Sequence, residues 1–373
     1  MPSNTRPGPN IESLAIIAAI IAAALGFGGT FLVLGGRQAP LSSGIFGGDS
    51  IASIAIVVVA LTGAGSFIWG YIRHADGGLR WRRRHPIRRV LDVLGLTVTG
   101  AGVAVMLVGS LLQVSQLAFV GLVLDPVASA ALVAVLAAVS AYVLALIAGQ
   151  LTTSTLATLL ALFLVAGVFT SMLTADDPTW WRNNFSALGM GLAVSSIAFN
   201  LTVAIAGLAI LTLADYLTID LRSRRGPRGI NLRGSEITRG ALVLVGVALV
   251  GLGLVPVNVS VPIHNTFSIS ALVGFAALML AAPILLRGLP WAFIASTLVF
   301  TVVLVASTVL FARGAFNLTA LELIAVSVIF TWLILFTRNA STGRDLMDAE
   351  PADGSGTLDA AAPTPAPGQV PPA

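Results

Sequence analysis

The chain contains no cysteine and no lysine, and charged residues make up only 10% of its 373 residues. The absence of cysteine excludes disulfides, thiolate zinc sites and iron–sulfur clusters. A soluble domain carries about 25% charged residues, so the low charge excludes a water-soluble fold. None of the three histidines lies inside an apolar run, which argues against a membrane-embedded bis-histidine haem. No cofactor is expected.

Apolar residues are what the chain has in abundance: 57% of it is hydrophobic and its mean hydropathy is +0.96. Backbone groups in a bilayer must be satisfied internally, and the apolar runs lack the alternation of barrel strands. The sequence therefore predicts an all-α, polytopic transmembrane helix bundle of ten spans, since a span needs about 20 apolar residues. The spans are expected at 11–34, 51–72, 90–112, 127–148, 152–174, 187–213, 240–257, 268–286, 290–312 and 318–337.

Two densely basic loops, 73–89 and 222–239, orient these spans. The positive-inside rule places both loops in the cytoplasm, which puts the N- and C-termini there as well. Only Arg37, Arg182 and Arg313 then lie outside. The outer loops that carry polar residues are expected at 175–186 and 255–267.

The predicted organisation is a short cytoplasmic N-terminus (1–10), a transmembrane domain (11–338) and a disordered, Pro/Ala-rich cytoplasmic tail (339–373). The tail lacks the apolar content that offsets ordering entropy. The first span is too long for a cleaved signal peptide, so we expect it to be retained. An all-arginine basic set together with abundant alanine, glycine and valine is typical of a GC-rich bacterial genome, and we expect a bacterial cytoplasmic membrane.

The stretch DDPTWWRNNFSALG (176–189) gathers polar and aromatic residues between two predicted spans. Tryptophan favours the membrane boundary, and the Ser186 hydroxyl is expected to cap the following helix. If this loop meets 255–267, the two segments form a binding site for an anionic headgroup, with Arg182 contacting phosphate. One histidine and two adjacent aspartates make a weak metal signature, so no metal is expected. The candidate residues of this outer site are Asp176, Asp177, Trp180, Trp181, Arg182, Asn183 and His264.

Few polar residues are expected at membrane depth. Asn200 lies near the middle of its predicted span, where we expect it to bond another helix. Glu322 lies four residues into the last span, where it either faces a cavity or reaches back to the outer interface. No carboxylate is expected at the midplane, which argues against a proton-coupled transporter but not against a lipid translocator.

Two similar segments precede predicted spans on the same side: 184–189 has Asn, Phe-Ser, Ala-Leu and Gly, and 265–274 has the same order with insertions. They indicate either two related helix hairpins whose outer loops meet or a chance similarity in an apolar background.

The stretches TWWRNNFSALG (179–189) and IAFNLTVAIAGL (197–208) resemble a family of bacterial multi-span membrane proteins of unknown function. The resemblance covers roughly the fifth to eighth spans and implies a membrane location, with no established activity. It rests on Trp180, Trp181, Phe185, Ser186, Leu188, Gly189, Phe199, Asn200 and Gly207.

The leading functional hypothesis is a non-enzymatic envelope protein that engages lipid or a lipid-linked headgroup at its outer face, with translocation as one form of that activity. One alternative is a membrane enzyme with an outer site built from Asp176, Asp177 and His264. Another is a scaffold or sensor that recruits cytoplasmic partners. The arginine loops are expected to contact anionic lipids of the inner leaflet, with a favourable contribution of about 1 kcal/mol per residue. This contact accounts for the basic residues of the loops, so no nucleic-acid partner is expected. No pattern indicates an oligomeric state.

Overall fold

The computed structural model describes residues 11–43, 50–75, 86–223, 232–286 and 289–341. Within these residues, ten helices are long and apolar enough to cross a membrane, which confirms the predicted all-α bundle. In the part of the chain that the structure describes, the one sheet is a two-stranded antiparallel ribbon, β1 (Ala39–Pro40) with β2 (Val123–Leu124). The helices are α1 (Ile11–Leu34), α2 (Ile51–Ala75), α4 (Pro86–Ala118), α5 (Pro126–Gly149), α6 (Thr153–Leu173), α7 (Val194–Ser223), α8 (Leu232–Leu254), α9 (Val261–Leu285), α10 (Trp291–Ala312) and α11 (Leu318–Ser341).

Two predicted span limits are wrong in ways that matter for the outer site. The span expected from residue 187 begins only at Val194, because residues 185–189 form a short 3-10 helix, η2 (Phe185–Gly189). The span expected from 268 begins at Val261, where Pro262 occupies the first turn. Proline suits that position because it has no N–H to leave unpaired and its φ is already helical. His264 therefore lies on a membrane helix and not in a loop.

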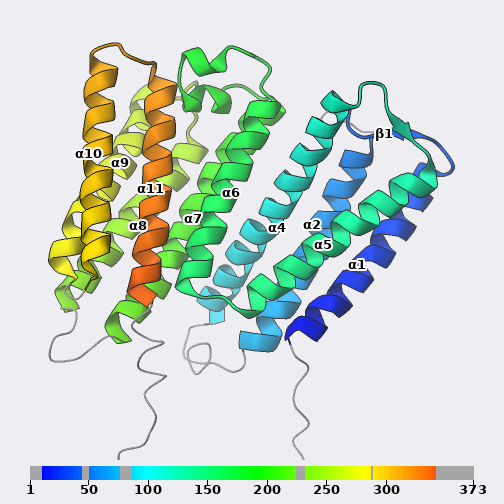
Figure 1. Cartoon of the computed structure of the whole chain (residues 1–373), viewed down its shortest axis with the longest axis horizontal. Coiled ribbons are helices and arrows are strands. Elements are labelled where there is room, and N and C mark those ends of the chain that lie inside the picture. The colour runs from blue at the N-terminus through cyan, green and yellow to red at the C-terminus, as the bar shows by residue number, and fades with distance from the viewer. Residues whose placement is uncertain (1–10, 44–49, 76–85, 224–231, 287–288, 342–373) are drawn as a thin grey trace, which may run out of the picture.

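The helices fall into two neighbouring groups, which Figure 1 shows side by side. The first group contains α1, α2, α4 and α5, and the second group contains α6–α11. The two groups meet where α4 contacts α6 and α7. Small residues allow close approach within each group, as expected for membrane helices. A Cβ on Gly70 of α2 would lie 2.6 Å from the Ala145 carbonyl oxygen of α5, and one on Gly207 of α7 would lie 2.6 Å from that of Gly246 on α8.

An aromatic cluster joins the last three helices. Trp332 of α11 is fully buried and lies 5.4 Å from Phe275 of α9 and 5.7 Å from Phe293 of α10, between ring centroids. Its indole N–H donates to the Thr297 hydroxyl at 2.9 Å. Aromatic pairs at such separations contribute about 0.5–1.5 kcal/mol each beyond their buried area, so this cluster fixes α9, α10 and α11 against one another.

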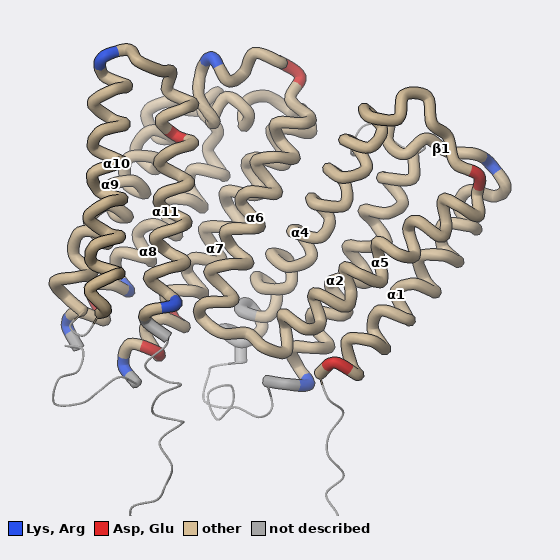
Figure 2. The backbone as a smooth tube through the Cα atoms, viewed as in Figure 1, with Lys and Arg blue, Asp and Glu red and all other residues tan. Residues whose placement is uncertain are grey.

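The charged residues that the structure describes gather at the two ends of the bundle (Figure 2). The first residue of α1 and the last residue of α11 lie at the same end, which we call the inner end. The outer end carries Arg37, Arg182 and Arg313, as the alternation of the helices requires. The predicted N-terminus (1–10), residues 76–85 and 224–231 of the two basic loops, and the tail beyond 341 lie outside the described residues. The rest of the second basic loop, 232–239, forms the beginning of α8.

Candidate functional site

The segment between α6 and α7 folds over the outer end of the second helix group (Figure 1). We call residues 174–193 the outer cap. Asp177 begins it by accepting hydrogen bonds from the Thr179 hydroxyl and backbone N–H, both at 2.7 Å. These two bonds, the hydroxyl first, hold the pKa of the Asp177 carboxyl below its ordinary value. A short 3-10 helix, η1 (Trp180–Arg182), follows, and the Asn184 side chain then caps η2 by accepting from the Ala187 N–H at 2.9 Å.

Three hydrogen bonds tie the outer cap to α9 and to the beginning of α11. The Ser186 hydroxyl lies 3.0 Å from Nε2 of His264. The Phe185 N–H donates to the Glu322 carboxylate at 2.7 Å, and the Asn317 side-chain amide donates to the Trp181 carbonyl at 2.8 Å. The expected contact between the segments 175–186 and 255–267 is therefore present, and α11 is a further partner.

The two tryptophans of the outer cap have different surroundings. Trp180 is partly buried, with its ring 5.5 Å from that of Phe185, and it packs against a cluster that contains buried Leu188 and Phe199. Trp181 is 47% exposed, and the Arg182 guanidinium lies 5.5 Å from its ring centroid. Only Trp180 therefore packs inside the cap, whereas Trp181 and Arg182 form an exposed cation–π pair.

His264 is buried, with 3% of its surface exposed, and both ring nitrogens are bonded. Nδ1 lies 2.8 Å from the Val255 carbonyl oxygen. A carbonyl oxygen only accepts hydrogen bonds, so Nδ1 carries a proton, and in the neutral imidazole Nε2 then accepts from the Ser186 hydroxyl. This single tautomer follows from the partners of the ring.

The acidic residues of the predicted site are not partners of His264. Asp176 and Asp177 are exposed at the start of the outer cap, and both nitrogens of His264 are occupied by Val255 and Ser186. Asn183 is exposed as well. Among the described residues, no acidic side chain lies within 4.0 Å of Arg182, so Arg182 forms no ion pair with Asp176 or Asp177. In the same part of the chain, no three His, Asp or Glu side chains gather as metal ligands.

The two polar residues predicted at membrane depth both serve the outer cap. Because α7 begins at Val194, Asn200 lies in its second turn and not at mid-span, and its amide donates to the Gly189 carbonyl at 2.9 Å. A Cβ on Gly189 would lie 2.5 Å from Oδ1 of Asn200, so this approach requires glycine. The Glu322 carboxylate accepts a hydrogen bond from the backbone N–H of Phe185, so its partner lies in the outer cap.

The roles of Ser186 and Asn317 were not anticipated from sequence. Ser186 was expected to cap a helix, whereas Asn184 is the residue that caps η2. Asn317 precedes the last span and also caps α11 by accepting from the Ala320 N–H at 3.1 Å. A sequence signal existed only for Glu322, as a lone carboxylate inside an apolar span. The two similar segments also differ, because 185–189 is a 3-10 helix whereas 265–274 lies within α9.

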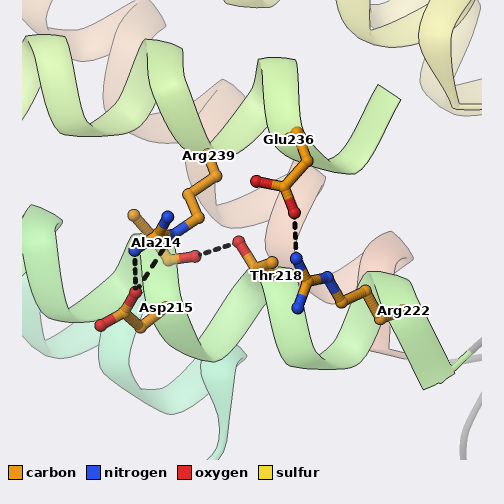
Figure 3. Close-up of polar contacts among 6 residues, drawn as sticks. All are labelled: Ala214, Asp215, Thr218, Arg222, Glu236 and Arg239. Atoms are coloured by element: carbon orange, nitrogen blue, oxygen red, sulfur yellow. Dashed lines mark hydrogen bonds and ion pairs between the residues drawn. The ribbon is translucent and has the colours of Figure 1, made fainter. Parts of the chain in front are cut away.

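A second polar cluster lies at the inner end between α7 and α8 (Figure 3). Two guanidinium nitrogens of Arg239 lie 3.2 Å from Oδ1 of Asp215, and Arg222 pairs with Glu236. Asp220 accepts from the Thr153 hydroxyl of α6. Paired charges near helix ends are the usual way to place ionisable groups in membrane proteins, so this cluster explains how α7 and α8 stay in register.

The ten apolar helices of the described residues, with charges gathered at the two ends of the bundle, define an integral, multi-pass membrane protein. Residues 155–339 match the model of a family described as a protein of unknown function, DUF998. The predicted resemblance to an uncharacterised multi-span membrane family is thereby confirmed. The match runs from α6 to α11 and so extends two spans beyond the predicted coverage. No curated protein and no solved structure matches the chain. The outer cap and all its partners lie inside the matched segment.

Proposed function

We propose that the protein binds the anionic headgroup of a lipid, or of a lipid-linked molecule, at its outer end, with Arg182 as the cation. The supporting observation is the exposed Trp181–Arg182 pair on the outer cap. Arginine contacts phosphate through two parallel N–H donors, and tryptophan favours the level of the headgroups. The pair therefore combines a side chain that binds phosphate with a side chain that anchors the outer cap at the membrane interface.

Anchoring of the outer cap favours this role. Asn317 holds the carbonyl of Trp181, and Glu322 holds the N–H of Phe185. The backbone on both sides of Arg182 is thus fixed by α11 before any ligand arrives, which lowers the ordering cost of binding. Leu192 of the same cap is 95% exposed, which suits contact with acyl chains.

The proposal also assigns each end of the helix bundle to one side of the membrane. The excess of arginine at the inner end supports a cytoplasmic inner end, with the basic loops contacting anionic lipids there. The outer cap would then face the far side of a bacterial cytoplasmic membrane. Translocation would add to this binding function the movement of the bound lipid from one leaflet to the other.

Lipid binding tests the proposal directly. Full-length protein is purified in detergent, and native mass spectrometry counts bound phosphatidylglycerol against zwitterionic phosphatidylcholine. We expect a preference for phosphatidylglycerol that falls several-fold in Arg182→Gln. Arg313→Gln is the matched control, since it removes another outer arginine and should leave the preference unchanged. Equal binding of the two lipids by the wild type, or equal losses in both variants, would overturn the proposal.

Translocation is measured separately in liposomes that carry a fluorescent phospholipid in both leaflets. Bleaching of more than the outer leaflet by a membrane-impermeant reductant would indicate movement between leaflets. Bleaching of half of the label would restrict the function to binding.

A further inference from the structure

We infer that Ser186 and His264 form a nucleophile–base pair that transfers an acyl group from an ester. Nε2 of His264 lies 3.0 Å from the Ser186 hydroxyl, and Nδ1 lies 2.8 Å from the Val255 carbonyl. The carbonyl holds the proton on Nδ1, so the lone pair of Nε2 faces the serine O–H. A hydroxyl donating to an oriented, neutral imidazole is the arrangement that activates serine as a nucleophile.

The imidazole is positioned by the fold. His264 lies in the first turn of α9, where its N–H donates to the Ser260 carbonyl at 2.9 Å. Val255 follows directly after α8, so the turn between α8 and α9 supplies the group that orients the ring. A backbone carbonyl replaces the carboxylate of a Ser-His-Asp triad. It sets the tautomer but carries no full charge to stabilise the imidazolium, so slow acylation is expected.

Two further features accompany the pair. Among the described residues, the backbone N–H of Ser186 has no hydrogen-bond acceptor, and the N–H of a nucleophilic serine is one of the groups that stabilises the developing oxyanion in such enzymes. The Glu322 carboxylate is bonded to the preceding residue, Phe185. This bond fixes the backbone one residue before Ser186.

The chemistry balances with the ester and one water molecule as the only reactants. Oγ of Ser186 attacks the carbonyl carbon of the ester, and its proton moves to Nε2 of His264. The ester C–O bond breaks, and the leaving alcohol takes that proton from Nε2. Water then attacks the acyl-Ser186 ester with His264 as base, releasing a carboxylic acid and restoring the hydroxyl.

The substrate class is a carboxylic ester of an amphipathic molecule. Exposed apolar side chains on the outer cap, Trp181, Met190 and Leu192, favour molecules that partition into the membrane boundary. This activity goes beyond the headgroup binding proposed above and does not require Arg182.

A fluorophosphonate probe, which traps activated serines covalently, tests the inference on the full-length protein in native membranes. Peptide mass spectrometry is expected to locate the adduct on Ser186. His264→Gln should slow labelling on the order of 100-fold, the size of a general-base contribution. Ser186→Ala should abolish it. Ser196→Ala is the matched control, since that buried hydroxyl donates only to the Gly191 and Ala193 carbonyls, and it should label like the wild type.

The wild-type protein alone can overturn the inference, whether or not the variants fold. No adduct on Ser186 after prolonged exposure, or an adduct on a different serine only, would show that the Ser186–His264 bond serves packing. Labelling that His264→Gln leaves unchanged in rate would do the same. Arg182→Gln should leave labelling intact, so failure of the lipid-binding proposal remains distinguishable from failure of this one.

Discussion

The Glu322 carboxylate on α11 accepts a hydrogen bond at 2.7 Å from the backbone N–H of Phe185, 137 positions earlier in the chain. This bond joins the last membrane helix to the outer cap, together with the Asn317 amide on the Trp181 carbonyl. The hydrogen bond from Phe185 gives Glu322, the one acidic residue of α11, a partner within the protein.

Glu322→Ala is expected to loosen the outer cap. Hydrogen bonds to charged groups contribute about 1.5–3 kcal/mol, and alanine leaves the Phe185 N–H without its acceptor. Hydrogen exchange at residues 180–189 should accelerate. Glu322→Gln is the control, because its amide oxygen still accepts; if exchange in the two variants were equally fast, charge and not the hydrogen bond would hold the cap.

Trp180→Ala is expected to loosen the outer cap more than Trp181→Ala. Trp180 packs against Phe185 and the Leu188 cluster, whereas Trp181 is exposed. The general preference of tryptophan for the membrane boundary does not distinguish the two side chains. Protease cutting at 176–193, timed in detergent, measures the difference. Faster cutting in Trp181→Ala than in Trp180→Ala would contradict this assignment of packing.

Gly167→Ala is expected to destabilise the contact between α6 and α7. A Cβ at Gly167 would lie 2.1 Å from Oγ1 of Thr202, a buried side chain that also donates to the Ala198 carbonyl. Overpacking of this kind costs about 1–3 kcal/mol, measured as a lower unfolding temperature in detergent. Gly28→Ala is the matched control, since nothing lies within 4 Å of a Cβ there; an equal loss in both would mean that helix flexibility matters instead.

Trp332→Ala is expected to destabilise the protein by about 3–5 kcal/mol, as large-to-small changes of buried aromatic residues do. Trp332→Phe keeps most of the ring contacts but loses the N–H bond to Thr297. A membrane hydrogen bond contributes about 0.6–2 kcal/mol, so this variant should lose less. Both are followed by thermal unfolding; a phenylalanine variant as unstable as the alanine variant would assign the stability to the hydrogen bond.

Reporter fusions should show on which side of the membrane each end of the bundle lies. Fusions after residues 80, 230 and 345 are expected to report cytoplasm, and fusions after 180 and 262 the opposite side, because arginine concentrates at the inner end. A cytoplasmic signal at 180 or 262 would remove the outer cap from the outer face and end the lipid-headgroup proposal.

Local composition was enough to predict the class of fold. A run of about 20 apolar residues has one stable form in a bilayer, so ten such runs predicted ten helices. An even number of spans then places both ends of the helical domain on one side, as Figure 1 shows. The clustering of polar residues between α6 and α7 also marked the segment that forms the outer cap.

Hydropathy alone, however, predicted neither where α7 and α9 begin nor which polar groups meet. The 3-10 helix η2 depends on the Asn184 cap and on the Asn200 amide bound to Gly189. The partners of Ser186 and Phe185 lie 78 and 137 residues away on α9 and α11. Such contacts depend on how far each helix is rotated about its axis, and packing of small and aromatic side chains sets that rotation. The sequence by itself therefore determined the helical class of the fold and that both ends of the helical domain lie on one side. Tertiary packing decided that His264 faces Ser186 and not Asp176 or Asp177.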